Sequence, residues 1–217
     1  MTTYVLVHGA WHGAWAWDRV VPLLAARTVV PELSGGNAGL EDHVDQVVAA
    51  LATTDGEVIL VGHSSAGLVV RQAADRRPDL VNHIVLVEGW AGPDGTSLFG
   101  MAPAWFSEAL RATAVDGLLP PVSAALLGIS DPGDARWVEQ HLRPHPLRTF
   151  VEPTRLTGAV DRIPGTAVYG RSARLPFADL ARALGYSTVP IDGPHDVMIT
   201  DPRTLAESLL RVRKSEV

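Results

Sequence analysis

The stretch from residue 58 to residue 70 limits the fold more than any other part of the chain. Four apolar residues, Val58–Val61, lead into Gly62, and a segment with helical character begins after three polar residues. This pattern predicts a buried strand, a sharp turn that carries Ser64, and a helix. A serine at such a turn has a strained backbone, so the residues two before and two after it must be small. Gly62 meets this demand, and Ala66 departs from the usual glycine by one methyl group.

Two interpretations of Ser64 follow from this context. In the first, Ser64 is only the N-cap of the helix, which is the usual explanation of an isolated Gly-x-Ser match. In the second, Ser64 is a nucleophile, and the N-terminus of the following helix favours the negative charge that develops on a reacting oxygen. The strand before the motif and the helix after it favour the second interpretation.

Composition excludes several classes of function. The chain has 217 residues, of which 47% are hydrophobic and 19% are charged, so it can bury a core. Its formal net charge of −6 argues against nucleic acid or an anionic membrane as a partner. The absence of cysteine removes disulfides, thiolate metal sites and cysteine nucleophiles, and it fits a reducing cytoplasm. No apolar run approaches the ~20 residues that span a bilayer, and Met1–Thr3 lead directly into a strand without a signal-like segment. We therefore expect a cytoplasmic protein that acts on a small-molecule substrate.

Apolar runs alternate with segments of helical spacing, which predicts an α/β fold with a mostly parallel sheet and helices on both faces. About six strands are expected, at Tyr4–Val7, Thr28–Leu33, Val58–Ser64, His83–Glu88, Gly165–Gly170 and Ser187–Ile191. The main helices are expected around 17–24, around 44–51, from Ser64 to near Pro78, at Phe177–Leu184 and at Pro202–Arg213. Between about residues 91 and 153 the alternation of strands and helices is interrupted by a Pro- and Gly-rich stretch with short helical segments. We predict a single domain, residues 1–217, with a small helical cap inserted at about 91–153.

A serine nucleophile needs a base and donors for the oxyanion. The chain has eight histidines, and His195 is favoured because it lies in a loop between the last expected strand and the last expected helix. The N–H group of Ser65, directly after the nucleophile, is one expected oxyanion donor, and the other should come from Ala10 or Trp11. Two such N–H groups matter because the loss of one donor costs about 2.7–4 kcal/mol in comparable sites. His63 is expected to line the pocket wall.

We predict no metal site and no cofactor. His8 and His12 are four residues apart, as are His141 and His145, but neither pair is expected to lie within one helix. The first pair spans a strand and a loop, where His8 is expected to brace the loop, and Pro144 interrupts the second, which is expected at the surface. The sequence has no Gly-rich phosphate loop.

Four segments together resemble the α/β-hydrolase superfamily, and most of all the small branch that holds plant methylesterases, hydroxynitrile lyases and bacterial esterase-like proteins. They are Val5-Leu6-Val7-His8-Gly9-Ala10-Trp11-His12-Gly13-Ala14-Trp15, Val61-Gly62-His63-Ser64, Val87-Glu88-Gly89-Trp90-Ala91-Gly92-Pro93-Asp94-Gly95 and Gly193-Pro194-His195-Asp196-Val197-Met198. The resemblance implies Ser64 as nucleophile, His195 as base, and the N–H groups of Ala10 and Ser65 as the oxyanion hole.

The sequence departs from this family at two places. The family's acid usually follows the strand that ends at Gly170, but Leu175 stands there. Glu88 ends the preceding strand, a position from which some hydrolases supply the acid, and we favour it as the orienting acid of a triad. The other carboxylates left open are Asp161, Asp179, Asp192 and Asp196. The lyases carry threonine in place of Gly9 and lysine in place of Asp196, so this sequence favours ester chemistry over cyanohydrin cleavage.

Aromatic residues near the site and in the cap predict an apolar pocket. The substrate-binding candidates are Trp11, His63, Trp90, Trp105 and Phe106. The favoured function is a serine esterase that cleaves a hydrophobic or aromatic ester, thioester or lactone. A cyclase, lyase or decarboxylase on the same scaffold is the alternative that the missing acid motivates, and a small-ligand-binding protein is the third. A monomer and a homodimer are both compatible with the sequence.

Overall fold

The computed structural model describes residues 1–171 and 174–212. Its centre is a six-stranded sheet in the order β2-β1-β3-β4-β7-β8, and every pair of neighbours is parallel. The strands are β1 (Thr2–Val7), β2 (Arg27–Val29), β3 (Glu57–His63), β4 (His83–Val87), β7 (Gly165–Gly170) and β8 (Ser187–Ile191). The parallel α/β sheet of about six strands that the sequence predicts is therefore confirmed.

The central strands are buried because helices cover both faces of the sheet. All six residues of β1 and all five of β4 are buried, as expected of continuous apolar runs in a parallel sheet. The edge strand β2 is shorter than the predicted Thr28–Leu33. The chain leaves the sheet after Val29, and further on the N–H group of Leu33 donates to the Nε2 atom of His8 instead of to a strand.

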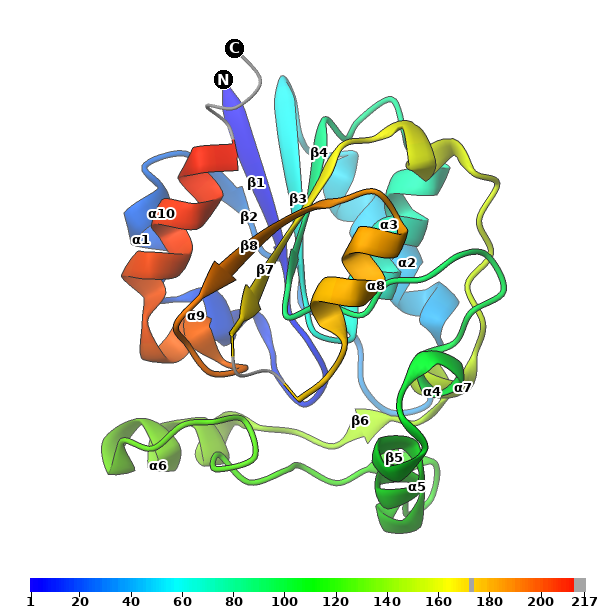
Figure 1. The fold of residues 1–217 in the computed structure, drawn as a ribbon, viewed down its shortest axis with the longest axis vertical. Helices are drawn as coiled ribbons and strands as arrows, with labels where there is room; N and C mark the ends of the chain where they lie inside the picture. Colours follow the sequence, from blue (N-terminus) through cyan, green and yellow to red (C-terminus); the bar gives the residue numbers. More distant parts are fainter. Residues whose placement is uncertain (172–173, 213–217) are drawn as a thin grey trace.

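Figure 1 shows one group of helices on each side of the sheet. One side carries α1 (Val21–Leu24), α9 (Val197–Thr200) and α10 (Pro202–Val212), and the other carries α2 (Leu40–Leu51), α3 (Ala66–Arg76) and α8 (Phe177–Ala183). The helix predicted around residues 17–24 is instead a 3₁₀ turn, η1 (Ala14–Trp17), followed by the short α1 with Pro22 in its first turn. A second 3₁₀ turn is η2 (Ala159–Arg162). The predicted end of the last helix at Arg213 lies outside the described residues.

The segment between β4 and β7 holds four short helices and a two-stranded antiparallel sheet. These elements are α4 (Leu98–Met101), α5 (Ala104–Thr113), β5 (Leu118–Leu119), α6 (Pro132–His141), β6 (His145–Pro146) and α7 (Arg148–Val151). Figure 1 shows them beyond the carboxyl ends of the parallel strands, where sites of open α/β sheets lie. We call residues 91–153 the cap segment; its assignment as an insertion in a single domain stays a prediction.

Within the described residues, no helix is both long enough and apolar enough to cross a membrane.

Candidate active site

Ser64 lies in a strained turn at the carboxyl end of β3. Its φ angle is +53°, in the left-handed region that a side chain disfavours, which costs of the order of 1–3 kcal/mol. The Ser64 N–H group donates to the Val87 carbonyl at 3.0 Å, and its carbonyl accepts from Gly67 and Trp90, each at 3.0 Å. A Cβ atom on Gly62 would lie 2.7 Å from the Val70 side chain, which explains why this position has no side chain. The turn is thus held by β4, by the segment that follows β4 and by α3.

His195 faces Ser64 from the loop between β8 and α9. The Ser64 hydroxyl lies 3.0 Å from His195 Nε2, and His195 Nδ1 lies 3.3 Å from Glu88 Oε2. Phe177 stacks on the imidazole with 5.8 Å between ring centroids and 20° between ring planes. This geometry suits a ring whose Nδ1–H donates to the carboxylate and whose Nε2 accepts the serine proton.

Glu88 is the carboxylate that the structure brings to His195. It is 4% exposed, has a φ angle of +48°, and its Oε1 atom accepts the Gly170 N–H group at 2.5 Å. Three of the alternatives pair with arginines instead: Asp161 with Arg71, Asp179 with Arg182 and Asp192 with Arg171. The fourth, Asp196, lies behind the site. The short side-chain contacts therefore run from Ser64 through His195 to Glu88.

The loop after β1 presses against Ser64. A Cβ atom on Gly9 would lie 2.9 Å from both Ser64 Cβ and His63 Nδ1, so only glycine allows this approach. His8 braces the loop, because its Nδ1–H donates to the Gly9 carbonyl at 2.9 Å while its Nε2 accepts the Leu33 N–H at 3.0 Å. That arrangement needs a neutral ring, and burial lowers the pKa of His8 to about 4.

The N–H groups of Ala10 and Ser65 are free to serve a ligand. Neither donates a hydrogen bond to another described residue. Ser65 is the N-cap residue of α3, and the first N–H groups of a helix have no partner within it. Trp11, the other residue considered for the oxyanion loop, has a φ angle of +65°.

Known proteins that are similar to this chain show its family. The sequence pattern of the Alpha/beta hydrolase family matches residues 4–208. The chain belongs to this family. It is 33% identical to a carbendazim hydrolyzing esterase of Nocardioides sp. (strain SG-4G), over 96% of this chain and 98% of that protein. It is 34% identical to methylesterase 9 of Arabidopsis thaliana, over 45% of this chain and 43% of that protein.

Among solved structures, the chain is similar to an extracellular α/β-hydrolase from a Paenibacillus species. That structure, described as sharing homology with tobacco salicylic acid binding protein 2, superposes with a TM-score of 0.86 at 23% identity. The alignment covers 97% of this chain and 98% of the Paenibacillus chain. It supports the α/β-hydrolase fold.

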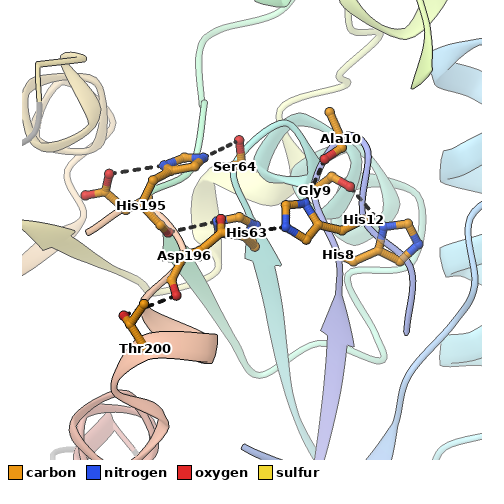
Figure 2. A network of polar contacts seen from close by, with 10 residues as sticks. His8, Gly9, Ala10, His12, His63, Ser64, His195, Asp196 and Thr200 are labelled. Atoms are coloured by element: carbon orange, nitrogen blue, oxygen red, sulfur yellow. Dashed lines mark hydrogen bonds and ion pairs between the residues drawn. The ribbon is translucent and has the colours of Figure 1, made fainter. Parts of the chain in front are cut away.

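Behind the contacts from Ser64 through His195 to Glu88 lies a second polar cluster, made of His12, His63 and Asp196 (Figure 2). His12 Nε2 lies 2.8 Å from Asp196 Oδ2, and His63 Nε2–H donates to the His195 carbonyl at 3.1 Å. The ligand-type atoms of the three side chains lie within 4.8 Å of one another, so a metal ion would find suitable ligands here. The direct hydrogen bond already joins two of these atoms, however, and we interpret the group as a hydrogen-bonded cluster.

One prediction about an individual side chain needs correction, and two others stay predictions. His63 and Trp90 are expected to contact substrate, and they are 0% and 2% exposed. His63 packs between His195 and His12, and Trp90 packs against Phe106 and Phe177. His145 is expected at the surface, but it is buried among the rings of Trp11, His43 and Phe150 and hydrogen-bonds to Thr149.

The other expected pocket residues keep some access. Trp105 is 56% exposed and its ring contacts Phe106, which is partly buried. A cavity of about 300 Å³ adjoins the loop after β1 and is lined in part by His8, Trp11 and Leu118. Neither Ser64 nor His195 lines it. The cavity is thus next to the loop after β1 and not over the serine hydroxyl.

Proposed function

We propose that this chain is a serine hydrolase that cleaves a hydrophobic or aromatic small-molecule ester, thioester or lactone through an acyl-enzyme. The observation that carries the proposal is the chain of contacts from Ser64 to His195 at 3.0 Å and from His195 to Glu88 at 3.3 Å. A hydroxyl, a base and an orienting carboxylate in this order form the arrangement of a catalytic triad, whatever the order of the residues in the sequence.

In the first half of the reaction, Ser64 Oγ attacks the carbonyl carbon while His195 Nε2 takes the hydroxyl proton. The N–H groups of Ala10 and Ser65 stabilise the oxyanion that forms. Glu88 keeps the remaining proton on Nδ1 and stabilises the imidazolium. The carbon–oxygen bond to the alcohol then breaks, and His195 returns the proton to the leaving alkoxide.

In the second half, His195 removes a proton from water, which attacks the acyl-enzyme. Ser64 leaves with the proton from His195, so the enzyme returns to its starting state and the substrate gains one water. No step requires a metal or a cofactor, which is why we expect activity without either. The lack of cysteine supports the cytoplasm as the site of action.

The relatives support the ester class, since a relative that aligns with nearly the whole chain is named an esterase. The main reason for a non-hydrolytic alternative was the absence of an acid at Leu175. Glu88 now supplies a carboxylate at His195 Nδ1, so that reason no longer favours a cyclase, lyase or decarboxylase. The exposed Trp105 and its neighbour Phe106 favour an apolar alcohol or acyl group.

The test is hydrolysis of a panel of aromatic and aliphatic esters, with carbendazim as the first compound because of the relative's name. Ser64→Ala should lower kcat by on the order of 10⁶. Ser65→Ala is the matched control and should change kcat little, because only its backbone N–H is used. A Ser64→Ala variant that keeps its activity would overturn the proposal, and size-exclusion chromatography of the same samples separates monomer from homodimer.

A further inference from the structure

His12 is held on both of its ring nitrogens by oxygen acceptors. Its Nδ1 atom lies 2.8 Å from the Ala10 carbonyl and its Nε2 atom lies 2.8 Å from Asp196 Oδ2. A carbonyl has no proton to give, and neither has a carboxylate, so both ring nitrogens must donate. His12 is therefore an imidazolium, and its contact with Asp196 is an ion pair.

This ion pair is fully buried, with 1% of the His12 side chain and none of the Asp196 side chain exposed. Burial alone would lower the pKa of His12, but the charge of Asp196 and the hydrogen bond to it outweigh burial and raise that pKa. Burial would raise the pKa of Asp196, and the same contact with His12 lowers it. Both shifts favour the charged forms, which agrees with the hydrogen-bond geometry.

A buried ion pair contributes little net stability, because the loss of hydration offsets the attraction between the charges. This pair is also incompletely satisfied, since Asp196 Oδ1 accepts no hydrogen bond from the described residues. Stability is thus a weak reason for its presence. Its position offers a better one, because it joins two loops that both take part in the proposed chemistry.

On one side, the pair holds the loop after β1, which carries the proposed donor Ala10 and which we call the oxyanion loop. His12 fixes the Ala10 carbonyl, which lies in the same peptide plane as the Trp11 N–H group. Because only the Ala10 Cα atom separates this plane from the Ala10 N–H group, the hydrogen bond also restrains that N–H group. On the other side, Asp196 directly follows His195, and its N–H group donates to the Leu127 carbonyl of the cap segment at 3.2 Å. The Nε2–H group of His63 donates a hydrogen bond to the His195 carbonyl at 3.1 Å.

We propose that the His12–Asp196 pair is a positioning device that fixes the catalytic base loop against the oxyanion loop, so that His195 and the oxyanion donors keep their geometry relative to Ser64. The proposal rests on the proposed function of Ser64 and His195. Neither His12 nor Asp196 touches the Ser64 hydroxyl, so both act through neighbouring residues.

The test is a double-mutant cycle with p-nitrophenyl butyrate as substrate. Asp196→Asn keeps the shape of the side chain and removes its charge, and His12→Asn keeps a donor near the place of Nδ1 but cannot reach Asp196. Each single variant should lower kcat by about 10- to 100-fold with KM within about threefold, the loss expected when reacting groups shift by up to ~1 Å. The double variant should be no slower than the slower single variant, because the link is already broken.

Asp75→Asn is the matched control. Asp75 is another buried carboxylate, near the far end of α3, where it accepts the N–H groups of Thr157 and Val160. This variant should lower the melting temperature while kcat stays unchanged. If the His12 and Asp196 variants behave in the same way, or if their losses in kcat multiply, the positioning role is wrong.

Nitrogen-15 NMR of the histidine rings gives a readout that does not depend on activity. At pH 7, both nitrogens of His12 should carry protons in the unmodified protein, and Asp196→Asn should abolish the doubly protonated form. A singly protonated His12 would overturn the proposal, as would one equivalent of zinc bound to the purified protein and lost with the His12 variant. Failure of the proposed function is distinguishable, since it would appear as unchanged hydrolysis by Ser64→Ala.

Discussion

Replacing Glu88 by glutamine exchanges a single oxygen atom for an NH₂ group, and the structure determines which end of the new amide faces His195. The Gly170 N–H group, 2.5 Å from Oε1, requires an acceptor, so the amide oxygen must stay on that side. The NH₂ group then takes the place of Oε2, 3.3 Å from His195 Nδ1. Because two donors cannot face each other, His195 moves its proton to Nε2 and can no longer accept the proton of Ser64.

The expected loss in kcat is up to ~10⁴, the effect known for a triad acid changed to its amide, and it corresponds to about 5 kcal/mol of activation free energy. The assay is steady-state hydrolysis of the best ester of the panel, with circular dichroism to verify the fold. Asp192→Asn is the matched control, since Asp192 is exposed and pairs with Arg171, and it should keep normal kcat. Glu88→Gln with near-normal kcat, together with a loss in Asp192→Asn, would refute the assignment of the acid.

Two further predictions concern the oxyanion loop and the buried histidines. Gly9→Ala should lower kcat by about 10- to 100-fold, because its Cβ would lie 2.9 Å from Ser64 Cβ and must displace the loop. Gly35→Ala is the control and should keep normal kcat, because no heavy atom lies within 4 Å of its Cβ. Equal kcat for both variants would contradict this prediction. Four buried histidines have lowered pKa values because burial penalises the charged ring: His8, His43, His63 and His145. Below pH 6.5 these histidines bind protons in the unfolded chain but stay neutral in the folded protein. The free energy of unfolding should therefore decrease as the pH is lowered. The pKa of about 4 at His8 alone removes about 2 kcal/mol between pH 7 and pH 5, whereas the raised pKa of His12 acts in the opposite direction. Urea unfolding at pH 7 and pH 5 measures this change in the free energy of unfolding. His8→Gln should reduce the dependence of stability on pH. A stability that is equal or higher at pH 5 would show that the buried histidines do not behave as described.

Sequence alone predicts the features that depend on neighbouring residues. The turn at Ser64 follows from small residues on either side of it and from the apolar run before it. The structure places it at the end of β3, and its positive φ agrees with the strained backbone that the sequence predicts. The six strands follow from their apolar runs. Their ends are less predictable. The N–H group of Leu33 donates to the side chain of His8, the residue directly after β1, and not to a neighbouring strand.

Contacts between distant segments are what the sequence leaves open. The choice of Glu88 over Asp161, Asp179 and Asp192 depends on which strands are neighbours, and the order β3-β4-β7-β8 places Glu88 beside both Ser64 and Gly170. The pairing of His12 with Asp196 joins residues 184 positions apart, and no local pattern signals it. The inward direction of His63 is likewise set by its packing between the rings of His12 and His195.

The central claim is that Ser64 is the nucleophile, and the most direct measurement is the mass of the protein after reaction with a fluorophosphonate probe. We expect one equivalent of probe to add, and peptide mapping should place it on Ser64, within the peptide that contains Gly62, His63 and Ser65. Labelling should be absent in Ser64→Ala and should slow in Glu88→Gln, because the attack needs the His195 base. An adduct on Ser65, or labelling that persists in Ser64→Ala, would contradict the account.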